Sequence, residues 1–488
     1  MLGKLKRLGS QTLIYGSGNL INKLLGFILI PVYSQFIPIA DFGILAVLEI
    51  SILFLSSVLH FGINSGHQRY FYIEKDNKSY GTFLFSNYFG NLMITMVALL
   101  PLLLFSKDLS HLFFRNTDNA LVFQLAMWIT LSEIMNIFPL QVLQYEDKPV
   151  SYLLLNVTKL VLSFSLTIYL IIHYHMGIDG ILYARLSGNG IIMLFSILFI
   201  ILPRCSLHFN LNAIKKTILF GLPLVASNIG YLIFQMNDRY MLNWLSTGAE
   251  TGKYAFGFKI ANIINLLLVQ SIGISYLPSV FSSEEKENNV RYYSKVLTYY
   301  IFLMATITLA FLLFYRDLLS LVVYDSEYWS GLAIVPILSL SFIVLGMNYF
   351  VCIGLFLKNK TNYYIIPSLI TAAVNILLNF ILIPRYGMFG AAASTLTSQI
   401  IYTAILTLVS NRIYPVPFEW KKIFLIFFLA MVAYLVSVNI ATGHFILDLV
   451  IRVFIILLIP VSLLKLGFFE TIEKERLKEI FLKWTGKV

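Results

Sequence analysis

The chain has 488 residues, of which 58% are hydrophobic and only 12% are charged. Soluble domains carry about 25% charged residues, so this composition excludes an ordinary soluble protein and predicts a multi-pass membrane protein. The long apolar runs show no alternation with period two, so we expect an all-α fold. The formal net charge of +11 is spread over short loops rather than gathered in one domain, so nucleic acid is not an expected partner.

Apolar runs of about 20 residues, the length that crosses the hydrocarbon core as a helix, recur along the whole chain. They predict fourteen membrane-spanning helices. The predicted spans are 11–35, 42–65, 81–105, 119–143, 150–173, 180–202, 217–244, 253–280, 295–315, 331–357, 362–384, 389–410, 422–441 and 445–466.

The distribution of Lys and Arg between the loops gives the expected orientation. With the N-terminus in the cytoplasm, one side of the membrane carries most of the basic residues. The loops on the other side carry only Lys107, Arg115, Lys253, Arg316 and Arg385. The positive-inside rule therefore predicts that both termini are cytoplasmic. The start, MLGKLKRLGS, lacks the cleavage site of a signal peptide, so we expect it to remain as a cytoplasmic segment.

Two short stretches suggest an internal repeat. Gly177 and Gly180, after the fifth predicted span, recur at the same spacing as Gly387 and Gly390, after the eleventh. We therefore expect two six-helix lobes in parallel orientation, then a terminal helix pair and a tail. These predicted domains are 1–203, 204–411, 412–467 and 468–488. Transporters built from repeats bind substrate between the halves. The tail mixes apolar and charged residues, which fits either an amphipathic helix on the cytoplasmic surface or a solvated segment.

Charged residues inside the predicted spans are the candidates for function. A charge at membrane depth costs about 2.5–3.5 kcal/mol on insertion scales and usually faces water or a partner. The densest cluster lies in the predicted hairpin 231–267. Its polar members are Gln235, Asn237, Asp238, Arg239 and Lys259. Lys23 in the first span, flanked by Asn19 and Asn22, is grouped with them. The first two spans of each lobe would border a cavity between the lobes.

Other intramembrane charges have structural explanations. Glu133 and Lys159 lie on neighbouring spans of one lobe and are expected to form an ion pair. Arg185 lies near the outer end of its span and is expected to extend to the interface. Asp448 and Arg452 are four residues apart on one helix face, so we expect them to pair with each other.

Signatures of an enzyme are missing from the sequence. The seven histidines show no zinc-ligand spacing with Cys, Asp or Glu, and no soluble segment is long enough to bind a nucleotide. Gly16-Ser-Gly18 lies inside an apolar run, where a helix-packing notch is expected rather than a phosphate loop. We therefore expect a transporter without a cofactor, driven by an ion such as H⁺ or Na⁺, or by the membrane potential.

Four stretches resemble bacterial oligosaccharide flippases of the multidrug/oligosaccharidyl-lipid/polysaccharide exporter superfamily, in the O-antigen (Wzx-type) branch. They are PVYSQFIPIADFGILAVLE (31–49), FGINSGHQRYFYIEKD (61–76), NDRYMLNWLSTGAETGKYAFGFKIA (237–261) and IPRYGMFGAAAST (383–395). The resemblance covers nearly the whole length. It implies that the two lobes form a V around a central cavity, which opens alternately to either side of the bacterial inner membrane. It also implies a cargo of undecaprenyl-pyrophosphate-linked oligosaccharide.

The resemblance also implies roles for individual residues. The family's cavity is described as cationic, and the matching positions here are Lys23, Arg239 and Lys259. Arg69, in the turn after the second span, matches a basic position of the family pattern and is expected to hold the inner gate or the pyrophosphate. Glu49 and Asp238 are expected either to pair with the cavity cations or to carry a coupling proton.

The expected partners are the polyprenyl-pyrophosphate-linked glycan, membrane lipids, and the polymerase and chain-length proteins of polysaccharide assembly. Two alternatives from the same superfamily are a lipid II flippase and a multidrug/cation antiporter, the latter expected to have a cavity dominated by carboxylates. A polysaccharide polymerase or ligase is a third alternative, but that class typically carries a large outer loop that this sequence lacks.

Overall fold

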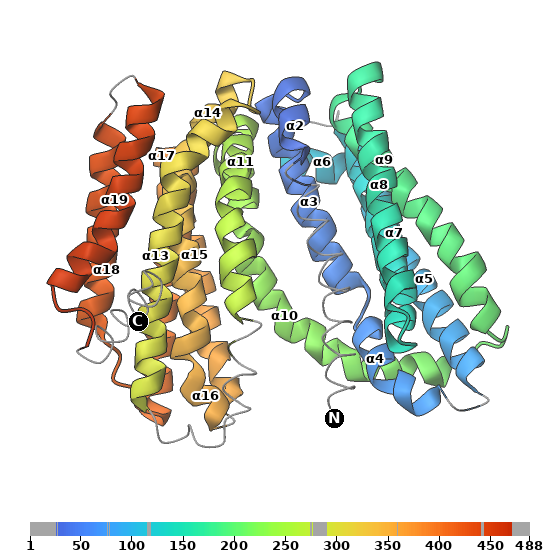
Figure 1. Cartoon of the computed structure of the whole chain (residues 1–488). Coiled ribbons are helices and arrows are strands. Elements are labelled where there is room, and N and C mark those ends of the chain that lie inside the picture. Colours follow the sequence, from blue (N-terminus) through green and yellow to red (C-terminus); the bar gives the residue numbers. More distant parts are fainter. Residues whose placement is uncertain are drawn as a thin grey trace, which may run out of the picture. The chain divides into compact units, whose positions relative to one another are not determined.

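The computed structural model describes residues 26, 28–75, 77, 79–114, 119–273, 276, 290–358, 360–440 and 444–470. Within these ranges the regular secondary structure is helical throughout, and no strand occurs among them (Figure 1). The predicted all-α fold is therefore confirmed. Of the first predicted span, 11–35, only the end belongs to the described residues, and the tail after residue 470 lies outside them.

The described α-helices are α2 (Ile30–Phe36), α3 (Ile39–Leu59), α4 (Ile63–Glu74), α5 (Tyr80–Leu104), α6 (Ser106–Phe114), α7 (Ala120–Tyr145), α8 (Pro149–Tyr174), α9 (Gly177–Ser196), α10 (Leu211–Leu245), α11 (Gly248–Ile264), α13 (Val290–Ser320), α14 (Ser326–Gly331), α15 (Val335–Val351), α16 (Ile353–Leu357), α17 (Ile365–Ile413), α18 (Trp420–Asn439) and α19 (Phe445–Lys465). Short π or 3₁₀ segments are η1 (Ile197–Ile201), η2 (Leu202–Arg204), η3 (Asn265–Val269), η5 (Leu332–Ile334) and η6 (Thr361–Tyr364).

The helices agree with the predicted spans. In the described part of the chain, 11 helical segments are long and apolar enough to cross a membrane. One of them contains α17, which is interrupted at Gly387, where φ is 52° and ψ is −128°. The positive φ suits glycine, and the interruption separates the predicted spans 362–384 and 389–410. The predicted span 217–244 lies within α10, which is not one of these 11 segments and carries Asn237, Asp238 and Arg239.

The described chain divides into two compact units. The first comprises the described residues of Met1–Phe256, Val322–Gly331 and Ala372–Ser394. The second comprises the described residues of Gly257–Leu321, Leu332–Thr371 and Thr395–Val488. Several helices contribute to both units, so the units differ from the lobes expected from the repeat, and the lobe boundaries stay a prediction.

The first unit is built around α7. This helix packs against α3, α5, α8 and α9, and its side chains Met127, Ile134 and Phe138 are fully buried. Helix α10 lies against α3, α4 and α5 in the same unit. It begins after Asn210, whose side-chain oxygen accepts hydrogen bonds from the backbone N–H groups of Asn212 and Ala213 and so caps the helix.

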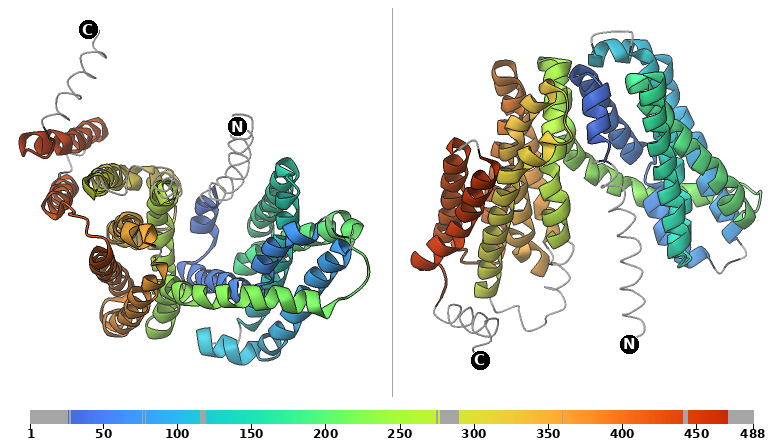
Figure 2. Two further views of the ribbon diagram at one scale, coloured as in Figure 1. Left: turned by 90° about the horizontal axis from the view of Figure 1, so that it is seen from below. Right: turned by 45° about the horizontal axis from the view of Figure 1, so that its top comes forward.

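The second unit is built around α13, which packs against α15, α18 and α19 (Figure 2). Large apolar side chains on α18 and α19 are exposed, among them Phe424 and Phe454, as expected for helices that face lipid. The guanidinium of Arg452 donates to the Leu313 carbonyl oxygen at 3.0 Å and to the carboxylate of Asp317 on α13. The ion-pair partner of Arg452 is thus on a neighbouring helix, and the expected pairing with Asp448 on its own helix was wrong. This ion pair connects α19, the second helix of the terminal pair, to α13.

Candidate functional site

In the described part of the first unit, six charged side chains lie on α3, α7, α8, α9 and α10 more than five residues from either helix end. They are Glu49 on α3, Glu133 on α7, Lys159 on α8, Arg185 on α9, and Asp238 and Arg239 on α10. Three are positive and three are negative, so the set is electrically balanced. Charges in a membrane are retained where they pair with one another or border water, and this balance indicates pairing.

The clearest pair is formed by Arg185 and Glu133. The Nη2 and Nε groups of Arg185 donate to the same carboxylate oxygen at 2.6 and 3.0 Å. The two side chains are 30% and 24% exposed, so they are largely removed from solvent. This contact between α9 and α7 differs from two predictions. Arg185 pairs with Glu133 where an extension to the interface was expected, and Glu133 pairs with Arg185 where Lys159 was the expected partner. Lys159 lies within the electrostatic influence of both residues.

Glu49 links this pair to α10. Its side chain is exposed, although the α3 residues on either side of it are buried. Its negative charge acts on the guanidinium groups of both Arg185 and Arg239. Glu49 is therefore an acidic group that interacts electrostatically with two arginines.

Asp238 has a different environment, in which three neutral side chains donate hydrogen bonds to the carboxylate. The Tyr254 hydroxyl of α11 donates to Oδ2 at 2.9 Å. The side-chain amides of Asn379 and Asn375, on α17, donate to Oδ1 at 2.8 and 3.4 Å. Asp238 is only 5% exposed, and all three donors are buried. A buried carboxylate is stable only with such donors. The Asn237 amide donates to Asn375 Oδ1 at 3.2 Å and extends the cluster.

Tyr254, Asn375 and Asn379 belong to this cluster but were not predicted from the sequence. A signal was present, because Asn375 and Asn379 stand four residues apart in an otherwise apolar helix and therefore share one face. Their contact with Asp238 could not be found from spacing, since 137 and 141 residues separate them from it.

The remaining predicted residues are distributed as follows. Gln235 is half-buried on α10, and Lys259 is half-buried on α11, where it belongs to the second unit. Arg69 is exposed on α4, and its guanidinium carbon lies 5.2 Å from the centre of the Phe220 ring on α10. Lys23, Asn19 and Asn22 lie outside the described residues.

A cavity of about 530 Å³ in the first unit borders one edge of this cluster. Its polar wall consists of Asn237 and of Ser51 and Tyr240, whose hydroxyl oxygens are 2.8 Å apart. The rest of the lining is apolar and includes Phe54 and Trp244. The polar cluster is thus flanked by a space suited to hydrocarbon rather than to sugar.

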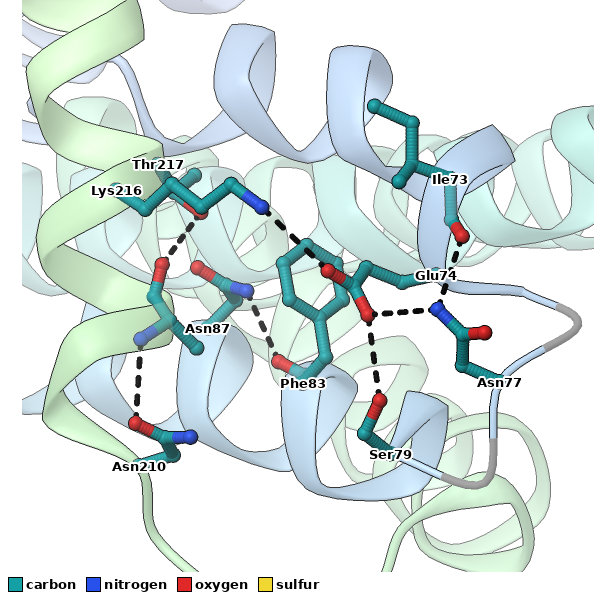
Figure 3. A network of polar contacts seen from close by, with 10 residues as sticks. Ile73, Glu74, Asn77, Ser79, Phe83, Asn87, Asn210, Lys216 and Thr217 are labelled. Carbon is teal, nitrogen blue, oxygen red and sulfur yellow. Dashed lines mark hydrogen bonds and ion pairs between the residues drawn. The ribbon is translucent and has the colours of Figure 1, made fainter.

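Helix α4, which carries Arg69, is fixed to α10 by polar contacts at its C-terminal end (Figure 3). The Lys216 ammonium of α10 lies 3.5 Å from Glu74 Oε1 and 4.2 Å from the centre of the Tyr70 ring. The other oxygen of Glu74 accepts hydrogen bonds from Asn77 Nδ2 and Ser79 Oγ, both at 3.3 Å. Ion pairing, a cation–π contact and hydrogen bonds therefore converge on one turn.

Solved structures share this helical arrangement. One, described as the lipid II flippase MurJ in an inward closed conformation, is 16% identical, with a TM-score of 0.73, and the match covers 93% of this chain and 99% of that chain. An inward-facing multidrug resistance MATE family transporter of the MOP superfamily is 14% identical, with a TM-score of 0.59, covering 80% and 94%. The Vibrio cholerae MATE transporter VcmN in its bent form is 17% identical, with a TM-score of 0.51, covering 83% and 96%. At these identities the similarity concerns the fold.

The sequence itself gives the family. No curated protein matched the chain. Residues 8–284, more than half of the chain, match the family described as polysaccharide biosynthesis protein. This match agrees with the resemblance seen in the sequence and with the transporter fold. The chain is therefore a multi-pass membrane protein that belongs to the polysaccharide biosynthesis protein family.

Proposed function

We propose that this protein is a flippase that moves a polyprenyl-pyrophosphate-linked oligosaccharide, such as an O-antigen or capsule repeat unit, from the cytoplasmic to the outer leaflet of the bacterial inner membrane. The observation that carries the proposal is the combination of a polysaccharide biosynthesis family with the fold of a lipid II flippase over 93% of the chain. No bond is made or broken. The protein shields a polar headgroup that would otherwise cross about 30 Å of hydrocarbon.

The intramembrane cations supply the attraction for the pyrophosphate. Arginine forks match phosphate oxygens bidentately, and Arg239 with Lys23 and Lys259 are the proposed contacts. We include Arg185 among the proposed pyrophosphate contacts because Glu49 interacts electrostatically with both Arg185 and Arg239. In the empty carrier Glu49 neutralises part of this positive charge, and a bound pyrophosphate takes over that role. Competition between the two anions keeps binding reversible.

Asp238 is the proposed coupling residue. Its buried carboxylate accepts hydrogen bonds from Tyr254, Asn375 and Asn379, and a proton or a small hard cation such as Na⁺ bound there would change the local charge. Arg69, at the α4–α10 contact, is the proposed inner gate or pyrophosphate contact. The lobes 1–203 and 204–411 would rock around the cavity, the pair 412–467 would accompany them, and the tail 468–488 would lie on the cytoplasmic surface.

The test is transport by variants in which Lys23, Arg239 and Lys259 are replaced by Ala, singly and together. In cells, surface glycan is measured. In proteoliposomes, the measured quantity is the accessibility of a labelled lipid-linked oligosaccharide. We expect loss of display at normal expression, partial recovery with Arg239→Lys, and no effect of Lys107→Ala, which alters an exposed lysine on α6. Unchanged display in the triple variant would refute the assignment.

A lipid II flippase is the second candidate, and the TM-score of 0.73 to the MurJ structure is the observation in its favour. Deletion of the gene separates the two. Loss of surface glycan with continued growth supports the oligosaccharide flippase. Lethality reversed by a known lipid II flippase supports the alternative. A multidrug antiporter is less well supported, because the intramembrane charges described here are balanced rather than predominantly acidic.

A further inference from the structure

A groove of about 550 Å³ lies on the first unit between α5 and the beginning of α10. Its floor includes Ile94 and Ile214, and its edges include Met93 and Leu219, which are 63% and 65% exposed. Gly90 brings the two helices together, because a Cβ atom there would overlap the side chain of Ile214. The groove is therefore an open apolar channel between packed helices, and none of the six charged residues of the candidate site lines it.

The first turns of α10 place this groove at a membrane boundary. Helix α10 has 35 residues. At 1.5 Å per residue it is about 52 Å long, which exceeds the hydrocarbon core of about 30 Å. Its beginning carries Asn212, Lys215 and Lys216 among apolar residues, and lysines whose stems lie along apolar surface are typical of a membrane interface. Hydrocarbon and headgroups are therefore both within reach of the groove.

Two adjacent lysines at this place differ in their surroundings. Lys216 forms an ion pair with Glu74 (Figure 3). Its ammonium also lies 4.2 Å from the centre of the Tyr70 ring. Lys215 is exposed and lies at the edge of the groove, and the described part of the chain contains no acidic group in ion-pair distance of its ammonium. An exposed cation beside an apolar channel is complementary to a molecule with a negative headgroup and a hydrocarbon chain.

We propose that this groove binds an anionic membrane phospholipid, with one acyl chain along Ile94 and Ile214 and the phosphate beside Lys215. A zwitterionic lipid fills the channel equally well but offers no net charge to the ammonium, so the site discriminates by headgroup. The proposal does not depend on the cargo. The bound lipid would connect α5 to α10, the helix that also holds α4.

The experiment uses the full chain in detergent, titrated with phosphatidylglycerol or with phosphatidylcholine of the same acyl chains, and bound lipid is counted by native mass spectrometry. We expect phosphatidylglycerol to bind at least five-fold more tightly. Lys215→Gln should abolish that preference and leave phosphatidylcholine binding unchanged. The matched control Lys216→Gln should retain the preference, because its charge is already compensated.

Three results would overturn the proposal. The first is equal binding of the two lipids to the unmodified chain. The second is an equal loss of the preference in both lysine variants, which would indicate general attraction to the basic surface. The third is displacement of the lipid by millimolar glycerol 3-phosphate, which would exclude a contribution from the apolar channel. Ile94→Trp, which fills the floor without altering charge, should weaken binding of both lipids, and unchanged binding in that variant would also count against the site.

Discussion

Gly221 of α10 lies directly against the backbone of Gly62, the residue before α4, and neither has room for a Cβ atom. A second contact of this kind joins Gly66 to Thr217 one turn away. These contacts, the Arg69–Phe220 contact and the Lys216–Glu74 pair all join α4 to α10. Since α4 belongs to the first predicted lobe and α10 to the second, this contact is a candidate gate.

Replacing Gly221 with Ala should destabilise the protein, because the new methyl group meets backbone atoms that cannot rotate away. Overpacking of this kind costs about 1–3 kcal/mol. We expect a clearly lower melting temperature in detergent. The matched control is Gly190→Ala on α9, where a Cβ atom meets nothing within 4 Å and a small gain in stability is expected. Equal melting temperatures for the two variants would contradict the close contact.

The Arg185–Glu133 pair should behave as a coupled unit. Removing one partner leaves the other charge without its hydrogen-bonded counterpart, whereas removing both leaves neither charge in the contact. A double-mutant cycle with Glu133→Gln and Arg185→Gln should give a coupling free energy of about 0.5–3 kcal/mol. Thermal unfolding of the four proteins measures it. Additive effects would show that the two side chains do not pair in the membrane.

Asp238→Asn tests the carboxylate–amide cluster. An Asn side chain offers one acceptor oxygen to Tyr254, Asn375 and Asn379 and turns an N–H group toward the remaining donors. A buried donor without a partner costs about 1–3 kcal/mol. We expect lower thermal stability and transport that no longer responds to the pH or Na⁺ gradient. Gradient dependence like that of the unmodified protein would remove Asp238 from the coupling role.

The loop that follows α7 provides a prediction about pH. Burial raises the pKa of Glu146, but hydrogen bonds and charges from Arg204 and Lys148 outweigh it, and the net pKa is lowered below the ordinary value of 4.5. Arg204 donates to both carboxylate oxygens at 2.7 and 2.9 Å. A lowered folded-state pKa adds stability that is complete above the unfolded pKa and is lost as pH falls through the folded value.

Glu146→Gln should therefore reduce the melting temperature at pH 7. The difference from the unmodified protein should shrink as the pH falls from about 4.5 toward the lower folded-state pKa. Melting curves between pH 7 and pH 3.5 provide the measurement, and Glu327→Gln, which alters an exposed carboxylate on α14, is the control. A constant difference across this range would rule out the assigned linkage.

The sequence was sufficient to predict the helices because helix formation in hydrocarbon depends on hydrogen bonds within each segment. A segment in hydrocarbon must satisfy its own backbone groups, so each long apolar run becomes a helix, and the break between spans at 362–410 was visible in Tyr386-Gly387. It also identified which positions carry intramembrane charge, among them Glu49, Asp238 and Arg239. The motifs around these residues gave the family.

The partners of those charges were decided only by the tertiary structure. Proximity in the predicted helices suggested that Glu133 pairs with Lys159 and that Asp448 pairs with Arg452. In the structure, Glu133 pairs with Arg185 and Arg452 pairs with Asp317. Partner choice depends on how each helix is rotated about its axis and on how closely two backbones approach. Those quantities are set by packing among helices distant in sequence, so hydropathy and spacing could locate the charges but could not pair them.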